Sequence, residues 1–92
     1  MLSLGFGLHP HHANEFSEPL LAEITHCLSS APRSFVGEIG LELRPQYCEK
    51  IPFAHQLSVF RRLFELGISL NKCIQIHVVS RGVPGAYPAL LE

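Results

Sequence analysis

The sequence predicts an α/β fold built as a parallel βαβαβ segment, and three observations support it. Short apolar runs alternate along the chain with two longer segments whose apolar residues recur at helical spacing. Both helical segments are long enough to serve as crossovers between parallel strands. Of the 92 residues, 47% are hydrophobic and 16% are charged, which is enough apolar material for the core of one domain.

The first predicted strand and helix occupy the amino-terminal third. Residues 4–8 (LGFGL) form an apolar run that ends at HPHH, and the residue before a proline favours extended geometry. Ser17 then provides a helix N-cap, and Leu20, Ile24 and Leu28 recur on one helical face. We therefore predict a strand, a loop and a helix with one buried face.

The longest predicted helix covers residues 53–70. Gly67 lies inside its apolar pattern, where glycine costs roughly 1 kcal/mol relative to alanine, so we expect close packing on a sheet there. Asn71 is the expected terminator. The predicted buried stripe consists of Leu57, Phe60, Phe64 and Ile68, with Leu63, Leu66 and Leu70 beside it.

Residues 35–41 and 73–79 are the second and third predicted strands, and both read as buried. Cys73 is expected to pack inside the third. Residues 87–92 are a candidate for another helix. Right-handed crossovers would bring the carboxyl ends of all three strands to one edge of the sheet, where ligands gather in such folds.

Glu38 lies in the middle of the second predicted strand, with a glycine on each side of the Glu38–Ile39 pair. An unpaired carboxylate is costly to bury, so this side chain needs a partner. A divalent cation is one candidate. A salt bridge to Arg33 or Arg81 is the other, and the spacing alone does not decide between them.

Alternation along the strands predicts that Glu38 and His77 point to the same side of the sheet. Val36, Glu38 and Gly40 would share one face of the second strand, and Gln75 and His77 one face of the third. A carboxylate and an imidazole directed at one point suit a divalent ion. The alternative for His77 is an ordinary hydrogen-bonded core histidine.

His9 and His11 belong to the HPHH tract that follows the first predicted strand. Histidines two residues apart share a face on a strand, but Pro10 and the loop context make a binding or capping role equally plausible. Metal binding by this tract therefore stays open.

Charge and cysteine content limit the partners and the compartment. The formal net charge of −1 gives no basic field for a polyanion, so contacts with nucleic acid would be local or metal-mediated. Cys27, Cys48 and Cys73 form no C-x-x-C pair, which favours free thiols in a reducing, cytoplasmic compartment. No apolar run has the length of a membrane span or the flanks of a signal peptide, so we expect no membrane partner.

Three stretches together resemble the TatD-type deoxyribonucleases, which are metal-dependent hydrolases of the amidohydrolase superfamily. They read GLHPHHA, FVGEIGLE and QLSVFRRLFELGISLNKCIQIH. The resemblance implies a (β/α)₈ TIM-type barrel, of which residues 1–92 would form a single partial domain containing strands three to five. It also implies hydrolysis of phosphodiester bonds, mostly in DNA, with one or two divalent ions, among which Mg, Mn and Zn are not distinguished.

The resemblance also implies roles for individual residues. Glu38 corresponds to the carboxylate that bridges two metals and His77 to a ligand of one of them, while His9, His11 and Arg81 would lie near the substrate. Two positions depart from the family pattern: Glu42 stands where aspartate is usual, and Arg81 follows His77 by four positions instead of two. The family's histidine-x-histidine pair and its later histidine and aspartate have no counterpart in this sequence.

Three functions follow as hypotheses. The first is a fragment or truncated form of a metal-dependent phosphodiesterase, inactive and weakly metal-binding as this chain alone. The second is a non-catalytic α/β protein that self-associates or binds a partner through exposed sheet edges. The third is a small metal-binding regulator built on the HPHH tract.

Overall fold

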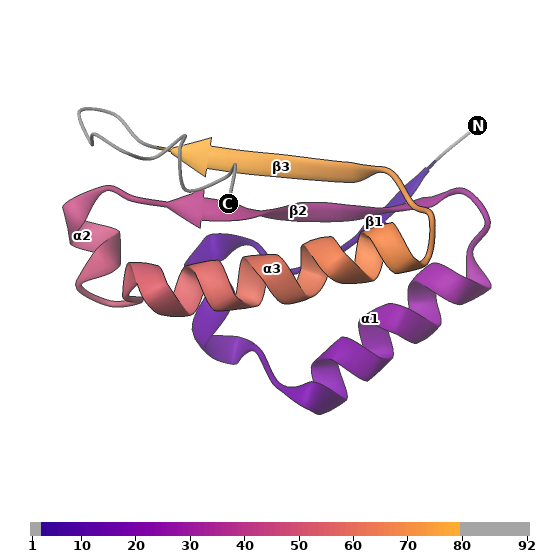
Figure 1. Ribbon diagram of the computed structural model, residues 1–92, viewed down its shortest axis with the longest axis horizontal. Helices are drawn as coiled ribbons and strands as arrows, with labels where there is room; N and C mark the ends of the chain where they lie inside the picture. Colours follow the sequence, from indigo (N-terminus) through magenta and orange to yellow (C-terminus); the bar gives the residue numbers. More distant parts are fainter. Residues whose placement is uncertain (1–2, 80–92) are drawn as a thin grey trace.

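The computed structural model describes residues 3–79 and forms one three-stranded parallel sheet with helices on one side (Figure 1). The strands are β1 (Leu4–Phe6), β2 (Ser34–Glu42) and β3 (Ile74–Val79), in the spatial order β1-β2-β3. Both pairs of neighbouring strands are parallel. The predicted βαβαβ arrangement is confirmed.

The two predicted helices are present, and two short helical turns were not predicted. The Ser17 hydroxyl accepts a hydrogen bond from the Leu20 N–H at 3.2 Å, so the predicted N-cap is confirmed. The short turns fill the two loops that follow β1 and β2. In chain order the helices are η1 (Pro10–Glu15, a 3₁₀ helix), α1 (Glu18–Ser30), α2 (Pro45–Cys48) and α3 (Phe53–Ser69).

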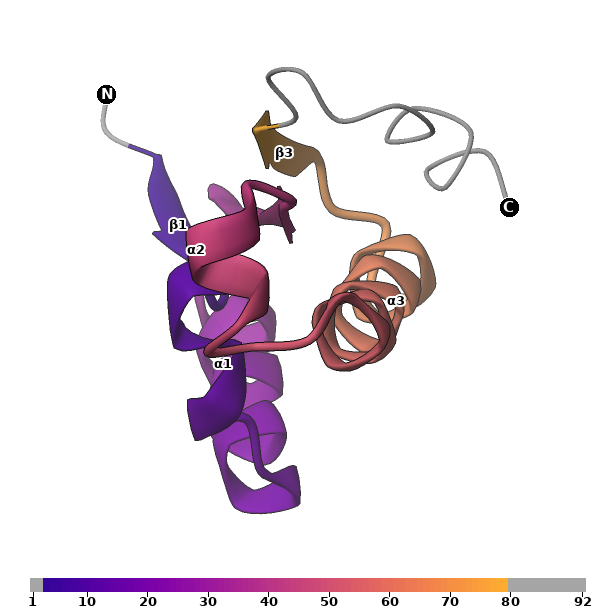
Figure 2. The ribbon, with the colours of Figure 1, turned by 90° about the vertical axis from the view of Figure 1, so that its left-hand side faces the viewer.

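The hydrophobic core lies between the sheet and the helices α1 and α3, which occupy the same side of it (Figure 2). Both crossovers place their helix there, as a common handedness requires. Within residues 3–79 no helix covers the opposite face. The fully buried core side chains are Leu28 of α1, Val36, Ile39 and Leu41 of β2, and Leu63 of α3.

Helix α3 buries part of the predicted set, since Phe60 and Leu63 are buried as predicted. Phe64 and Ile68 are 36% and 63% exposed, so their prediction as core residues is wrong. The helix instead turns Gly67 to the sheet, where an added Cβ would lie 2.8 Å from the Ile74 side chain and 3.1 Å from Val36. The predicted close packing at Gly67 is confirmed, and it determines which of two adjacent apolar stripes faces the core. The buried residues of α3 are Gln56, Val59, Phe60, Leu63 and Gly67.

The end of α3 follows the prediction. Asn71 adopts a positive φ of 54°, a conformation that asparagine tolerates better than most residues. The Lys72 N–H then donates to the Gly67 carbonyl at 2.9 Å, which satisfies a carbonyl left free at the helix end.

Strand β3 is not buried, contrary to the sequence prediction. Ile76 is 44% exposed, and Cys73 is exposed instead of packed. The reason is position: β3 is an edge strand of the described sheet, and α3 packs mainly against β2 and reaches β3 at Ile74. The candidate helix at 87–92 lies outside the described residues.

An irregularity in β2 changes which residues share a face. Val36 pairs with Ile74, but Ile39 pairs with Ile76, so β2 has one extra residue between these two points. Val36 and Ile39 are consequently both fully buried. The predicted face shared by Val36 and Glu38 is wrong, because strict alternation does not hold through the bulge.

Gln56 connects α3 to the end of β2 from a fully buried position. Its Oε1 accepts from the Glu42 N–H at 2.7 Å, and its Nε2 donates to the carbonyls of Glu42 at 2.9 Å and Ile51 at 2.8 Å. We predict that Gln56→Ala lowers the free energy of unfolding by about 2–3 kcal/mol, because buried backbone groups lose their partners. Urea unfolding measures this. Gln46→Ala, at an exposed position of α2, is the control, and equal losses in both variants would contradict the assignment.

None of the helices within residues 3–79 combines the length and the apolar composition that a membrane-spanning helix needs.

Candidate metal centre

Three side chains from three neighbouring elements meet on the side of the sheet that no described helix covers. His9 follows β1, Glu38 lies within the bulge of β2, and His77 lies in β3. One ligand atom from each lies within 4.8 Å of the others. The structure therefore brings together the predicted pair, Glu38 and His77, and adds His9 to it.

The separations within this cluster suit a divalent ion after small side-chain movements. Glu38 Oε1 lies 3.8 Å from His9 Nε2, and the ring centroids of His9 and His77 are 4.7 Å apart. Oxygen and nitrogen ligands lie about 2.0–2.2 Å from zinc, so two ligands of one ion are roughly 3–4 Å apart. Carboxylate and imidazole donors also suit zinc and manganese. The metal-ligand roles of Glu38 and His77 remain predictions.

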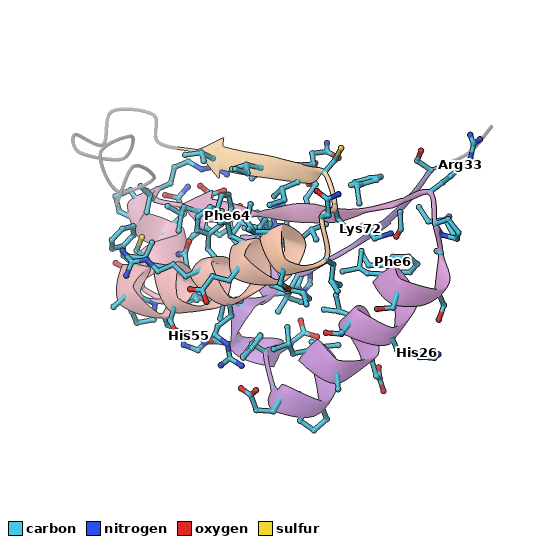
Figure 3. All side chains as sticks on the ribbon, turned by 45° about the vertical axis from the view of Figure 1, so that its right-hand side comes forward. Phe6, His26, Arg33, His55, Phe64 and Lys72 are labelled. Carbon is cyan, nitrogen blue, oxygen red and sulfur yellow. The ribbon has the colours of Figure 1, made fainter. Side chains whose placement is uncertain are left out.

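Glu38 is more exposed than the sequence suggested. Its side chain is 45% exposed, so the premise that this carboxylate is buried is wrong. The bulge places it on the uncovered side of the sheet. Arg33 precedes β2 at the opposite, amino-terminal end of that strand (Figure 3) and forms no salt bridge with Glu38 within residues 3–79. Arg81, the other predicted partner and a predicted substrate contact, lies outside the described residues.

His9 has a perturbed environment. Burial has the largest effect and lowers the pKa of His9, and the nearby rings of His11 and His77 lower it further, while Glu38 raises it. The net pKa is below the ordinary value of 6.5, so the ring is neutral at neutral pH. A neutral ring accepts and donates hydrogen bonds at different nitrogens.

The buried carboxylate of this region is Glu42, not Glu38. The Glu42 side chain is 1% exposed. Arg44 Nη2 and Nε donate to its two oxygens at 2.7 and 3.0 Å, and His11 Nε2 donates to it at 2.8 Å. Burial, the largest single effect, raises the pKa of Glu42, but the bonds from Arg44 and His11 together outweigh it and lower the pKa from 4.5 to about 2.

His11 is engaged by this network and is not one of the three clustered ligand candidates. Besides its bond to Glu42, its ring stacks on Tyr47 with centroids 4.3 Å apart and planes at 6°. His12 bonds to Glu15 instead. The HPHH histidines therefore have separate partners, which argues against the tract as a single metal-ligand set. The predicted substrate contact of His11 remains a prediction.

Sequence reasoning missed the structural role of Glu42. It recorded this residue only as a departure from aspartate. The available signal was Arg44, two positions later, because residues two apart on an extended segment lie on the same side. His11, far away in the sequence, could not have been assigned to Glu42 without the fold.

Acidification is expected to destabilise the chain through Glu42. Because its folded pKa lies below the ordinary value, its contribution is complete above about pH 4.5 and is lost as the pH falls toward about 2. The pKa difference corresponds to roughly 3 kcal/mol, and screening by solvent at the partly exposed Arg44 reduces the expected loss to about 2 kcal/mol. Urea unfolding between pH 5 and about pH 2 measures it. An equally steep decline in Glu42→Gln would contradict this assignment.

Comparisons with known proteins identify the family of this chain and agree with its fold. The family model described as TatD related DNase matches residues 1–91. The 3'-5' RNA nuclease TATDN2 of Homo sapiens is 33% identical over 72 residues, which make up 78% of this chain but only 9% of the human protein. No solved structure matches the chain. Since the family model covers nearly every residue, the chain belongs to the TatD-related DNase family.

Proposed function

We propose that this chain forms strands three to five of a (β/α)₈ barrel in a metal-dependent nuclease, and that residues 1–92 are one partial hydrolase domain. Barrel strands are parallel, with helices outside and the catalytic side chains at the carboxyl ends. The described sheet has its helices on one side only, and its cluster of polar side chains is on the other. The grouping of His9, Glu38 and His77 from three successive elements is the observation that carries the proposal.

Glu38 and His77 are the residues that would hold the ion in this proposal. A bound divalent ion supplies a nucleophilic water and neutralises charge on the scissile phosphate. Glu38 would contribute a carboxylate with two oxygen ligands. His77, on the neighbouring strand, would contribute a ring nitrogen. Mg, Mn and Zn are all compatible with this donor set.

The proposed substrate is a phosphodiester bond of DNA. The chain has a net charge of −1, so substrate attraction would depend on the ion and on local contacts such as His11 and Arg81. The name of the human relative refers to RNA, which makes RNA the alternative substrate to test. Free thiols at Cys27 and Cys48 support a reducing compartment, and we place the activity in the cytoplasm.

Replacing Glu38 with glutamine tests the proposed function. In a complete barrel of this family that carries this segment, we predict that Glu38→Gln reduces Mn²⁺-dependent DNA cleavage by at least about 100-fold, equal to roughly 2.7 kcal/mol. Glu49→Gln, an equal change of charge at an exposed position, is the control. Unchanged cleavage in Glu38→Gln would refute its role. Cleavage of RNA but not DNA would refute only the proposal that DNA is the substrate.

A second function is favoured by the exposed edge of β3. Ile76 is 44% exposed on a strand whose outer edge is unpaired within residues 3–79. Such an edge supports self-association. Light scattering after gel filtration distinguishes the two functions: a defined oligomer that persists in EDTA and is lost in Ile76→Lys supports association, and a monomer contradicts it.

A further inference from the structure

His9 is held in one orientation by the residues that follow it. Its side chain caps η1, because the backbone N–H of His11 donates to His9 Nδ1 at 3.1 Å. Pro10 joins the two residues, is buried, and has a restricted φ. Nδ1 of the His9 ring is therefore occupied by a hydrogen bond from the backbone.

This hydrogen bond determines which ring nitrogen carries the proton. A nitrogen that accepts a hydrogen bond has no hydrogen of its own, and in a neutral imidazole the hydrogen is then on the other nitrogen. For His9 that nitrogen is Nε2, which lies 3.8 Å from Glu38 Oε1. An Nε2–H has no lone pair available for an ion.

The residue that fixes His9 is itself firmly held. The His11 ring donates to Glu42, which is 1% exposed, and stacks on Tyr47. The other tautomer of His9 would set its Nδ1–H against the His11 N–H and abolish the cap. His77 has no such restriction, since neither of its two ring nitrogens is hydrogen-bonded to a residue within 3–79.

We propose that His9 is a positioning residue that directs a fixed Nε2–H toward Glu38, and that Glu38 and His77 hold the ion without it. The orienting role rests on the proposed metal centre, whereas the tautomer depends only on contacts within the chain. The separation of 3.8 Å exceeds a direct hydrogen bond. A rotation of the half-exposed Glu38 side chain would shorten this separation to hydrogen-bonding distance, and a bridging water would connect the two atoms without such a rotation.

Nitrogen-15 NMR of the histidine rings tests the tautomer in the metal-free chain. The His9 signals are identified by their loss in His9→Asn, and we expect the proton on Nε2. On addition of Zn²⁺, the His77 signals should shift while His9 keeps its Nε2–H. A proton on Nδ1, or loss of the Nε2 proton with Zn²⁺, overturns the proposal. If Zn²⁺ moves no histidine signal, the metal centre and the orienting role both fail, and the metal-free spectrum still decides the tautomer.

Two substitutions of His9 distinguish a role as a hydrogen-bond donor to Glu38 from a role as a metal ligand. His9→Asn keeps an acceptor near the place of Nδ1 but removes the donor, and His9→Gln puts an N–H near the place of Nε2. A donor role predicts Zn²⁺ affinity within about 3-fold of the wild type for His9→Gln and about 10-fold weaker for His9→Asn. Large and equal losses in both would identify His9 as a ligand and overturn the proposal.

Discussion

Gly40→Ala is expected to lower the free energy of unfolding by about 4 kcal/mol or more, a loss at the upper end for single substitutions. Gly40 pairs with His77 across β2 and β3, and a Cβ at position 40 would overlap the His77 carbonyl oxygen. The obstacle is backbone, so relief requires the strands to separate. That movement would also displace the His77 ring from Glu38.

Urea unfolding followed by circular dichroism measures the loss, and Gly67→Ala is the matched control. A Cβ at Gly67 would meet Cδ1 and Cγ1 of Ile74 at 2.8 Å and Cγ2 of Val36 at 3.1 Å, which are side-chain atoms and can shift more readily than backbone. Alanine also favours the helix by up to about 1 kcal/mol, so the net loss in Gly67→Ala should be clearly smaller than in Gly40→Ala. A Gly40→Ala variant as stable as Gly67→Ala would contradict the close approach of β2 and β3.

Glu42→Ala is expected to lower the free energy of unfolding by about 3 kcal/mol. The substitution removes a buried carboxylate and leaves Arg44 and His11 without their common partner. Because Arg44 is 34% exposed, water partly replaces the lost bonds, which keeps the loss at the lower end of the range for broken buried pairs.

The exposed pair between Arg62 and Glu18 provides the control for burial. Its bonds, at 2.6 and 2.9 Å, are as short as those of Arg44, but the Glu18 side chain is 68% exposed. Solvent-exposed pairs contribute little, so Glu18→Ala should leave the unfolding midpoint in urea nearly unchanged. Equal shifts in Glu18→Ala and Glu42→Ala would show that burial does not account for the effect.

Local patterns in the sequence predicted the elements of the fold and part of the candidate site. Apolar spacing located both long helices and all three strands, and Ser17 and Gly67 have the predicted roles. Parallel topology then brought Glu38 and His77 to one side of the sheet. These features depend on neighbours in sequence or on the general handedness of crossovers, so they could be predicted without knowledge of the detailed packing.

The features that were missed depend on contacts between distant segments. The bulge in β2 is a property of its register against β3, and it places Val36 on the covered side of the sheet, opposite Glu38. Two apolar stripes on α3 compete for the sheet, and the approach at Gly67 decides between them. The burial of Glu42 requires His11 from a loop that precedes it by 31 positions.

Titration of the chain with Zn²⁺, followed by calorimetry, is the most direct measurement of whether Glu38 and His77 share an ion. We predict weak binding to the wild type that is reduced at least about 10-fold in both Glu38→Ala and His77→Ala. His26→Ala removes an exposed histidine of α1 and should bind as the wild type does. Equal binding by all four proteins would contradict the account.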